Sequence, residues 1–340
     1  MLLRQRIRTT ILLAMAITVS MTTTGLSGAV AHAVGTSNVP ATNNVLKVSP
    51  VRTDVSIAAG TTKVVEATVT NLTSAPLSVT TIENDFIAGD EKGTPALILD
   101  ATKFAPTHSL KRFMAPITDV TIPAGKAVTI SVTITVPKDA QSGGYFGALR
   151  FAPSTQDTGG QVNLSASVAS LILLTVPGPA TEKLTLTNFD IQQDGKSGSN
   201  FRTPDNLTFA IRLQNAGNLQ EGPFGLITVK SGKKTIYSTN FNVDSPRDVI
   251  LPDSARRWDI PLKDIGTFGH YTVYATLTYG LNNQSLDIQK SFWVIPTWAF
   301  IAAGVAVLLL IGLVILFIVL MRLRRRRKAR RASNRGNLRY

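Results

Sequence analysis

Apolar and polar side chains alternate with a period of two residues in several segments between residues 45 and 295. The clearest segment is 127–136, where Val or Ile occupies every second position and Thr, Ser or Ala occupies the positions between them. The segments 65–69 and 207–213 repeat this alternation. Such a pattern is typical of β-strands with one face in a core, whereas the apolar positions of an amphipathic helix recur every three to four residues.

Further short segments with apolar residues recur along the same region, separated by Gly, Pro, Asn and Asp, which favour turns. Because no helical period lies between them, the pattern predicts an all-β fold of the sandwich type. The further strands that we expect are 46–57, 77–87, 145–152, 164–176, 183–191, 225–230, 234–241, 271–279 and 286–294.

Three landmarks occur twice in the same order, which indicates two domains. Each half contains an alternating strand that ends in Asn, then an aliphatic residue followed by Pro, and then a Lys-Asp loop that leads through Gly to a Tyr. The landmarks are Asn71, Ile122-Pro123 and Tyr145 in the first half, and Asn215, Leu251-Pro252 and Tyr271 in the second.

The two predicted immunoglobulin-like β-sandwich domains occupy residues 45–178 and 179–295, because Pro177 and Pro179 lack backbone donors and interrupt a continuous strand. Each landmark tyrosine opens a strand after a loop. This arrangement resembles the tyrosine corner of immunoglobulin-like folds, so we expect each hydroxyl to bond back to its loop. The alternative is that tyrosines open strands in many β-proteins without this role.

The segment 85–116 is an insertion in the first domain that departs from the strand pattern. It holds about 30 mostly polar residues, and a connection of that length is either functional or disordered. Its Asp85, Asp90 and Glu91 offer oxygen ligands for calcium, although not at the spacing of an EF-hand. A solvated polar loop is the alternative interpretation.

Both ends of the chain carry signals for membranes. Residues 1–33 are typical of a signal peptide, with three arginines before an apolar run and Ala31-His32-Ala33 at the expected cleavage site. An uncleaved N-terminal anchor is the alternative. Residues 34–44 form a linker to the first domain.

Residues 296–321 predict a transmembrane helix. The stretch 298–321 holds no charged residue, and a helix of that length is about 36 Å long, enough for a hydrocarbon core of about 30 Å. Trp293 and Trp298 stand at its outer edge, where indoles favour the membrane interface. The predicted fold class is therefore all-β, with two tandem immunoglobulin-like β-sandwich domains plus one C-terminal transmembrane helix.

The formal net charge of +14 is concentrated at the two ends of the chain. The tail 322–340 carries ten basic residues and no acidic residue, whereas residues 34–296 sum to about +1. Membranes retain Lys and Arg on the cytoplasmic side. We therefore expect a single-pass protein of the plasma membrane, with its N-terminal ectodomain outside the cell and its basic tail cytoplasmic and in contact with lipid. Nucleic acid is excluded as a partner, because its binding needs basic residues on the folded domains.

The chain has no cysteine, which excludes thiolate metal sites and cysteine nucleophiles. After residue 33 it has two histidines, His108 and His270, neither of which stands at metal-ligand spacing. We expect both at the surface or in turns. No nucleophile elbow, P-loop or dinucleotide-binding glycine pattern occurs. The sequence therefore predicts no enzyme, no catalytic or metal-binding residue and no cofactor, and it leaves the ligand-binding residues unknown.

The first domain resembles the WxL-interacting proteins of Gram-positive and related bacteria, while the second domain is only loosely similar. The segments that carry the resemblance are Leu46-Lys-Val-Ser-Pro50, Asn84-Asp85-Phe86, Ser109-Leu110 and 136–151. Phe113 stands where that family leads us to expect Trp. The resemblance implies a first domain that binds peptidoglycan and a second domain that binds host or partner proteins.

We therefore expect a membrane-anchored bacterial cell-surface binding protein whose first domain holds peptidoglycan, another cell-wall polymer or a partner surface protein. Two alternatives stay open. The chain is a structural or assembly subunit of a surface complex that pairs through sheet edges, or it is a wall-active hydrolase, because a carboxylate pair for glycoside hydrolysis has no sequence signature.

Overall fold

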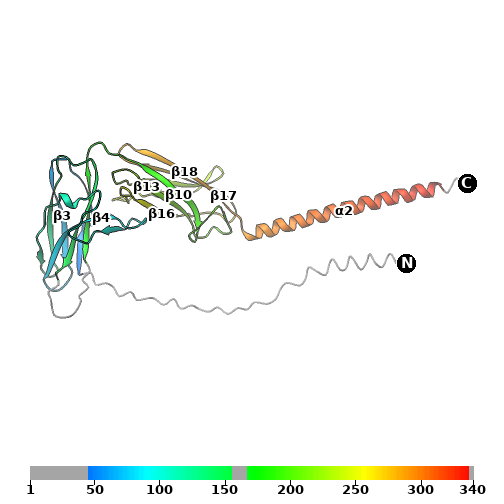
Figure 1. The fold of residues 1–340 in the computed structure, drawn as a ribbon. Coiled ribbons are helices and arrows are strands. Elements are labelled where there is room, and N and C mark those ends of the chain that lie inside the picture. The colour runs from blue at the N-terminus through cyan, green and yellow to red at the C-terminus, as the bar shows by residue number, and fades with distance from the viewer. Residues whose placement is uncertain (1–44, 155–166, 337–340) are drawn as a thin grey trace. The chain divides into compact units, whose positions relative to one another are not determined.

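The structure is a computed structural model that describes residues 45–154 and 167–336, with side chains described as far as Arg324. The signal peptide expected at 1–33 and the linker expected at 34–44 lie outside the described residues. The described chain folds into strands followed by one long helix (Figure 1).

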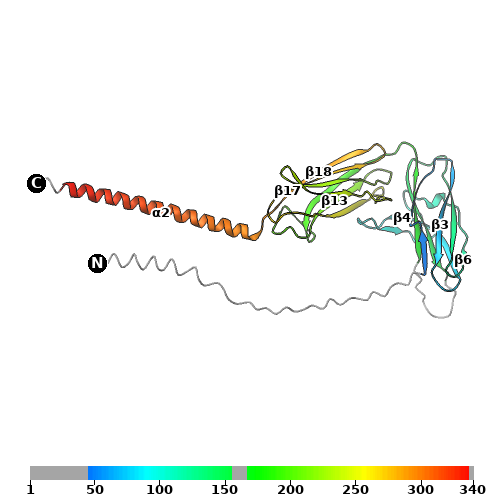
Figure 2. The same ribbon diagram turned by 180° about the vertical axis from the view of Figure 1, so that it is seen from behind.

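The first β-sandwich is immunoglobulin-like and consists of two facing sheets. Figure 2 shows it from behind. A short 3₁₀ helix, η1 (Lys111–Phe113), lies in the connection between the strands Pro95–Leu97 and Val120–Ile122. One sheet has the order β1 (Leu46–Ser49), β3 (Thr62–Asn71), β7 (Ala127–Thr135). The other has the order β2 (Arg52–Ser56), β9 (Val168–Val176), β8 (Gly143–Pro153), β4 (Leu77–Ala88), β5 (Pro95–Leu97), with β6 (Val120–Ile122) also beside β4.

The second β-sandwich repeats this architecture with its own two sheets. One sheet has the order β11 (Lys196–Gly198), β10 (Leu184–Gln193), β13 (Leu207–Asn215), β16 (Ala255–Pro261). The other has the order β12 (Asn200–Phe201), β18 (Gln284–Val294), β17 (Gly269–Tyr279), β14 (Phe224–Ser231), β15 (Lys234–Phe241).

Each sandwich has its own hydrophobic core, built from the alternate residues that the sequence pattern selects. In β7 the side chains of Ile130, Val132 and Ile134 are buried, and Thr129 on the opposite face bonds across to Thr68 of β3. In β13 the side chains of Phe209 and Ile211 are fully buried in the second core. The predicted fold class is confirmed: the protein is all-β, with two immunoglobulin-like sandwiches and one C-terminal apolar helix.

The repeated Asn landmark forms the same buried turn in both sandwiches. The Nδ2 of Asn71 donates to the carbonyls of Ala75 (2.8 Å) and Ile122 (3.0 Å). The Nδ2 of Asn215 donates to the carbonyls of Leu219 (2.7 Å) and Ile250 (3.0 Å). Ile250 is therefore the counterpart of Ile122. The repeat in the sequence paired Ile122 with Leu251, one residue later.

Both landmark tyrosines bond back to the loop before their strand, as predicted. The hydroxyl of Tyr145 donates to the carbonyl of Gln141 at 2.9 Å, and that of Tyr271 donates to the carbonyl of Phe268 at 3.3 Å. β9 ends at Val176 and β10 begins at Leu184, so the Pro-Gly-Pro segment lies in the connection between the sandwiches. The domain boundaries at 178 and 179 stay a prediction.

The insertion 85–116 is ordered, and its first part extends β4 into a hairpin with β5. The tip of this hairpin contacts the second sandwich: the carboxylate of Glu91 accepts hydrogen bonds from the guanidinium of Arg212 at 2.6 to 3.0 Å. The backbone N–H of Arg257, in β16, donates to the carbonyl of Glu91 at 2.7 Å. We call residues 88–95 the hairpin tip.

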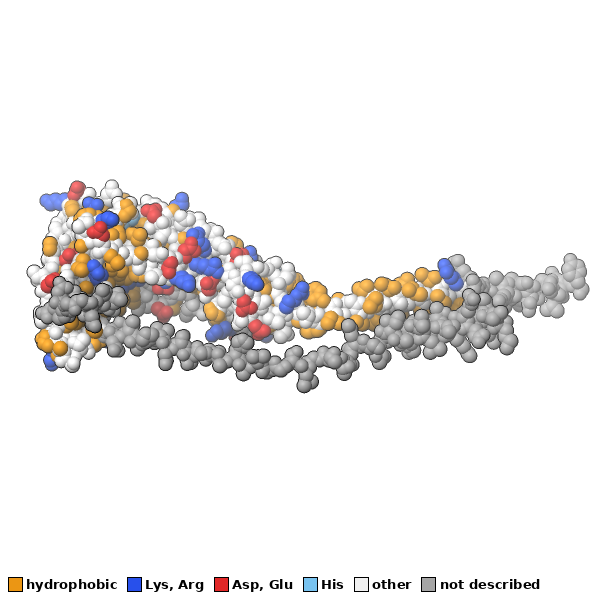
Figure 3. All heavy atoms as spheres, turned by 60° about the horizontal axis from the view of Figure 1, so that its bottom comes forward, with side chains coloured by type: hydrophobic (Ala, Val, Ile, Leu, Met, Phe, Trp, Pro, Cys, Tyr) orange, Lys and Arg blue, Asp and Glu red, His pale blue; other side chains and the backbone are white. Residues whose placement is uncertain are grey.

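The helix α2 (Thr297–Gly336) follows the second sandwich and continues into the basic tail rather than ending at residue 321 as expected. Its segment Thr297–Arg324 is long and apolar enough to cross a membrane. Figure 3 shows apolar side chains along the length of this segment. Trp298, at its start, is 59% exposed.

Candidate functional site

A fully buried carboxylate organises the second part of the insertion. Asp85, at 0% exposure, accepts hydrogen bonds from the backbone N–H of Ala105 (2.8 Å), the hydroxyl of Ser109 (2.6 Å) and the backbone N–H of Lys111 (2.8 Å). These bonds satisfy a buried charge with three donors from its own chain. Asp85 therefore has a structural role in fixing the loop, and it is not free to bind calcium.

The fixed loop brings His108 against the strand that opens with the tyrosine corner. His108 has a positive φ of 58°, a region that non-glycine residues seldom occupy. Its Nδ1 lies 2.6 Å from the carbonyl oxygen of Gly144. Because a carbonyl only accepts, Nδ1 carries the proton, and in the neutral ring Nε2 is an acceptor.

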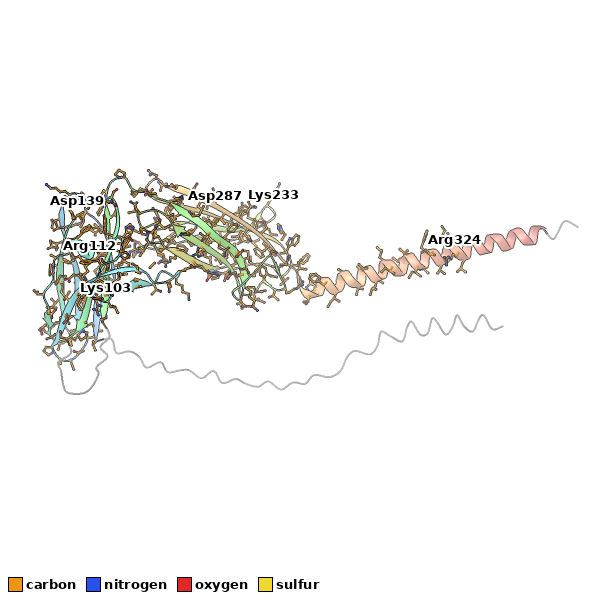
Figure 4. All side chains as sticks on the ribbon, viewed as in Figure 1. Lys103, Arg112, Asp139, Lys233, Asp287 and Arg324 are labelled. Atoms are coloured by element: carbon orange, nitrogen blue, oxygen red, sulfur yellow. The ribbon has the colours of Figure 1, made fainter. Side chains whose placement is uncertain are left out.

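His108 lines a pocket of about 390 Å³ that has both polar and apolar walls. Phe113 and Tyr145 form an aromatic pair beside it, with ring centroids 4.9 Å apart. Partial burial raises the pKa of the Tyr145 hydroxyl. Arg112, labelled in Figure 4, lies over the ring of Phe104 at 4.5 Å. We call this the His108 pocket, which is lined by residues 105–109, Arg112, Phe113, residues 141–143, Tyr145 and Asn218.

A second concave site lies on the outer face of the sheet that contains β8 and β9. Both faces of this sheet are apolar: Ile172 and Leu174 point into the sandwich core, whereas Phe146 and Leu173 belong to a separate outer cluster. Val249 of the second sandwich packs on that cluster. Packing leaves a groove of about 460 Å³.

We call this groove the outer-face groove. Its apolar lining includes Phe86, Leu171 and Leu173, and its rim carries Arg52 and Val51, of which Val51 is 66% exposed. The full lining is residues 50–52, Phe86, Ala88, Asp90, residues 93–95, Leu171, Leu173, Pro246, residues 248–251 and residues 254–256. Sequence reasoning missed this site. The available signal was the apolar run 171–174, which does not alternate and therefore indicates burial on both faces.

The remaining candidate residues have other partners. The carboxylate of Asp90 accepts from the backbone N–H groups of Lys92 and Thr94 within its turn, and these bonds lower its pKa. The carboxylate of Glu91 is bound by Arg212, which lowers its pKa. Asp90 and Glu91 therefore do not join Asp85 in a calcium site. Nowhere in the described part of the chain do three or more His, Asp or Glu side chains gather as metal ligands.

His270 lies in the second sandwich, away from the His108 pocket. Its ring packs against that of Trp293 with centroids 4.7 Å apart and planes tilted by 43°, and the two residues are cross-strand partners in β17 and β18. Because it packs against an indole at the sheet surface, His270 has a structural role, in agreement with the expectation for it.

The fold defines the class of this protein: a pair of immunoglobulin-like sandwiches followed by one apolar helix. No family model matches the chain, and no curated protein matches it. The resemblance to WxL-interacting proteins therefore stays a prediction.

Several solved structures are similar to the chain at low identity. A chain of the chaperone–tip adhesin complex of CFA/I fimbriae is 14% identical, with a TM-score of 0.38 over 72% of this chain and 98% of that chain. The class 5 fimbriae chaperone CfaA is 13% identical, with a TM-score of 0.37 over 73% and 98% of the two chains. The E. coli chaperone DraB is 13% identical, with a TM-score of 0.34 over 74% and 98%. TM-scores this low establish neither a shared fold nor a shared function.

Proposed function

We propose that this protein is a non-enzymatic, membrane-anchored surface subunit that docks an extended segment of another surface protein. The docking site is the outer-face groove together with the free edge of β2. The apolar helix holds the protein in the membrane, with the sandwiches outside the cell and the basic tail in the cytoplasm, as the charge distribution favours. The observation that carries the proposal is an apolar groove beside a strand edge to which no other described strand pairs.

The chemistry of the groove favours a polypeptide. Contiguous apolar surface that stays accessible in a folded protein commonly marks an interaction site. Leu171 and Val51 offer contacts for aliphatic or aromatic side chains, and the guanidinium of Arg52, on the rim, already donates to the carbonyl of Arg247 at 2.7 Å. A partner with alternating apolar side chains fits such a mixed surface.

The edge of β2 supplies main-chain groups for the same partner. Among the described residues, β2 is the terminal strand of its sheet and pairs only with β9, in parallel. Leu171 N–H donates to the carbonyl of Val51, and Ile57 N–H donates to the carbonyl of Thr175. Because alternate residues of a parallel strand bond to its neighbour, the N–H groups of Asp54 and Ser56 point to the free edge. An added strand bonds to these groups by β-augmentation.

Site-specific photocrosslinking on intact cells tests this function. A photoreactive phenylalanine analogue at Val51 should yield a discrete adduct with another protein, identified by mass spectrometry. The matched control is Val64, which is 52% exposed on β3 in the opposite sheet. Ser56→Pro should abolish the adduct, because it removes a donor of the free edge and keeps every bond to β9. Equal labelling at both positions, or monomer alone, would contradict the proposal.

A second candidate function, binding of a cell-wall polymer, is favoured by the His108 pocket. Aromatic faces and several donors and acceptors in one pocket suit a saccharide chain. The test is co-sedimentation of the full-length protein with peptidoglycan sacculi. Arg112→Gln should lower the bound fraction, whereas Lys103→Gln removes a cation outside the pocket and should leave it unchanged. Equal binding by both variants would assign the wall polymer to another surface.

A further inference from the structure

The second sandwich ends close to the start of the apolar helix. Strand β18 ends at Val294 and α2 begins at Thr297, and the three Cα–Cα steps between them span at most about 11 Å. The connection is also held in place, because the backbone N–H of Ile295 donates to the carbonyl of Phe201 at 2.8 Å. The end of the sandwich at Val294 therefore lies beside the surface of any membrane that the helix crosses.

Strand pairing places four other segments at this end of the sandwich. Strand β17 starts here, because its Gly269 pairs with Val294, whereas Tyr279 and Gln284 pair beside the turn at the opposite end. The four segments join strands that reach the same end, and they are residues 194–196, 202–206, 230–234 and 262–268. We call these segments the membrane-proximal end.

The membrane-proximal end carries an excess of basic side chains. The six basic residues are Lys196, Arg202, Lys230, Lys233, Lys234 and Lys263, and the three acidic residues are Asp194, Asp205 and Asp264. The formal charge is therefore +3. None of the six basic side chains forms an ion pair with another described residue. Lys233, labelled in Figure 4, is exposed in the turn between β14 and β15.

The opposite end of the same sandwich has the opposite charge. Its connecting segments 180–183, 216–223 and 242–254 hold two basic and five acidic residues, a formal charge of −3. The sandwich is therefore polarised along its strands, with the positive end beside the helix. The near-zero charge of residues 34–296 as a whole conceals this separation.

Exposed aromatic side chains lie beside the basic residues. Phe268 of the membrane-proximal end is 56% exposed, Trp293 in β18 is 44% exposed, and Trp298 in the first turn of α2 is 59% exposed. The ring centroids of Phe268 and Trp298 are 6.1 Å apart. Aromatic rings with exposed faces are favoured at the boundary between headgroups and acyl chains. Cations next to such rings are typical of surfaces that lie on a membrane.

We propose that the membrane-proximal end binds the anionic phospholipid headgroups of the membrane that α2 crosses. The lysines attract the phosphate groups, and Phe268 and Trp293 enter the boundary beneath them. This attraction acts over about 8 Å at physiological salt, which is comparable to the reach of the connection. The guanidinium of Arg202 already lies over the ring of Phe300, in the first turn of α2, at 4.2 Å.

Continuity with the helix favours lipid as the occupant of this surface. A soluble partner would have to enter between the sandwich and the membrane, where the connection leaves at most about 11 Å. The inference rests on the membrane anchoring in the proposed function, and it adds a contact that fixes which end of the second sandwich faces lipid. The contact is separate from the outer-face groove.

Spin labels on the full-length protein in lipid nanodiscs test the proposal. The chain has no cysteine, so single labels are introduced at Thr267→Cys in the membrane-proximal end, at Asn282→Cys in the opposite turn and at Leu309→Cys in the helix. The measurement is the ratio of collisions with oxygen, which concentrates in lipid, to collisions with a neutral nickel chelate, which stays in water. The nanodiscs contain phosphatidylcholine alone or phosphatidylcholine mixed with phosphatidylglycerol.

In the discs with phosphatidylglycerol, the ratio at Thr267→Cys should be several-fold higher than at Asn282→Cys. It should fall in phosphatidylcholine alone and in the double variant Lys233→Gln/Lys234→Gln, because the attraction to phosphate is then lost. The matched control is Lys47→Gln/Lys63→Gln, which removes two exposed lysines of the first sandwich and should keep the high ratio. Circular dichroism checks that each variant is folded.

The label in the helix separates the two ways in which the experiment can fail. A high ratio at Leu309→Cys with equal ratios at Thr267→Cys and Asn282→Cys would overturn the lipid contact and leave the anchoring intact. A high ratio at Thr267→Cys that depends neither on phosphatidylglycerol nor on Lys233 and Lys234 would overturn the recognition of anionic headgroups. A low ratio at Leu309→Cys would overturn the anchoring, and the lipid contact with it.

Discussion

The raised pKa of Glu221 predicts that one carboxyl group makes the second sandwich less stable as the pH rises. Burial and the neighbouring charge of Glu182 raise the pKa of Glu221 from its ordinary value of 4.5 to about 7 in the folded protein. Between these two values the folded chain holds a proton that the unfolded chain has lost. Stability therefore falls as the pH rises from 4.5 to about 7, and above that range the loss is complete.

The size of the loss follows from the difference between the two pKa values. At about 1.4 kcal/mol for each pH unit, the difference amounts to roughly 3 kcal/mol. Glu221→Gln keeps the shape of the side chain and removes the titration. The variant should therefore lack this loss. Its free energy of unfolding should exceed that of the unmodified protein at both pH values, and the difference should be several-fold larger at about pH 8 than at about pH 5.

Urea unfolding in the presence of EDTA measures this effect, because the chelator removes any divalent cation. All three tryptophans, Trp258, Trp293 and Trp298, lie in the second sandwich or at the start of the helix, so their fluorescence reports on that sandwich. Glu66→Gln is the control and should keep the pH dependence of the unmodified protein. The same pH dependence in Glu221→Gln would refute the assignment of a raised pKa to this carboxyl.

Three further predictions concern the buried polar groups and the hairpin tip. Asp85→Ala leaves three donors without their acceptor and should cost about 3 kcal/mol, measured by urea unfolding; an effect below about 1 kcal/mol would contradict its structural role. Asn71→Ala and Asn215→Ala should each cost about 2 to 3 kcal/mol in their own sandwich, because the Asn71 side chain makes five hydrogen bonds in its turn and the Asn215 side chain makes three. Glu91→Gln should change global stability little, since the pair with Arg212 is exposed, yet it should increase hydrogen exchange at residues 88–95.

Strand positions were predictable wherever one face of a strand meets the core and the other meets solvent. The alternation of Ile130, Val132 and Ile134 with Thr or Ser specifies both the strand and its buried face. The Asn landmarks were also readable, because a buried Asn that replaces backbone partners recurs at the same point of each sandwich. Asn71 and Asn215 indeed make equivalent bonds.

Strands that carry charges or lack length were not predictable. β16 contains Arg256, Arg257 and Asp259, so its composition indicates a polar loop. Its strand form depends on pairing with β13, a contact between distant segments. β5 and β6 have three residues each, too few for a period to appear.

The two candidate sites were only partly accessible to sequence reasoning. The insertion 85–116 was recognisable by its length, and it supplies two aromatic side chains, His108 and Phe113, to the His108 pocket. The position of the outer-face groove depends on which side chains of β9 face the sandwich core and which face outward. An apolar run such as 171–174 does not distinguish the two faces of the strand. Glu182 and Glu221 come from separate turns, so their proximity exists only in the folded chain.

The hairpin tip and the outer-face groove are mechanically linked through Arg256. Its guanidinium lies where a side chain at Gly93 of the tip would stand, with a Cβ to nitrogen distance of only 2.3 Å. The same guanidinium pairs with Asp248 at 2.7 Å, and both residues line the groove. A partner that enters the groove therefore contacts Arg256, whose position depends on the hairpin tip. The Glu91–Arg212 ion pair is exposed and therefore weak, so the hairpin tip can move while both cores stay folded. Docking of a partner should therefore depend on the tip more strongly than the free energy of unfolding does.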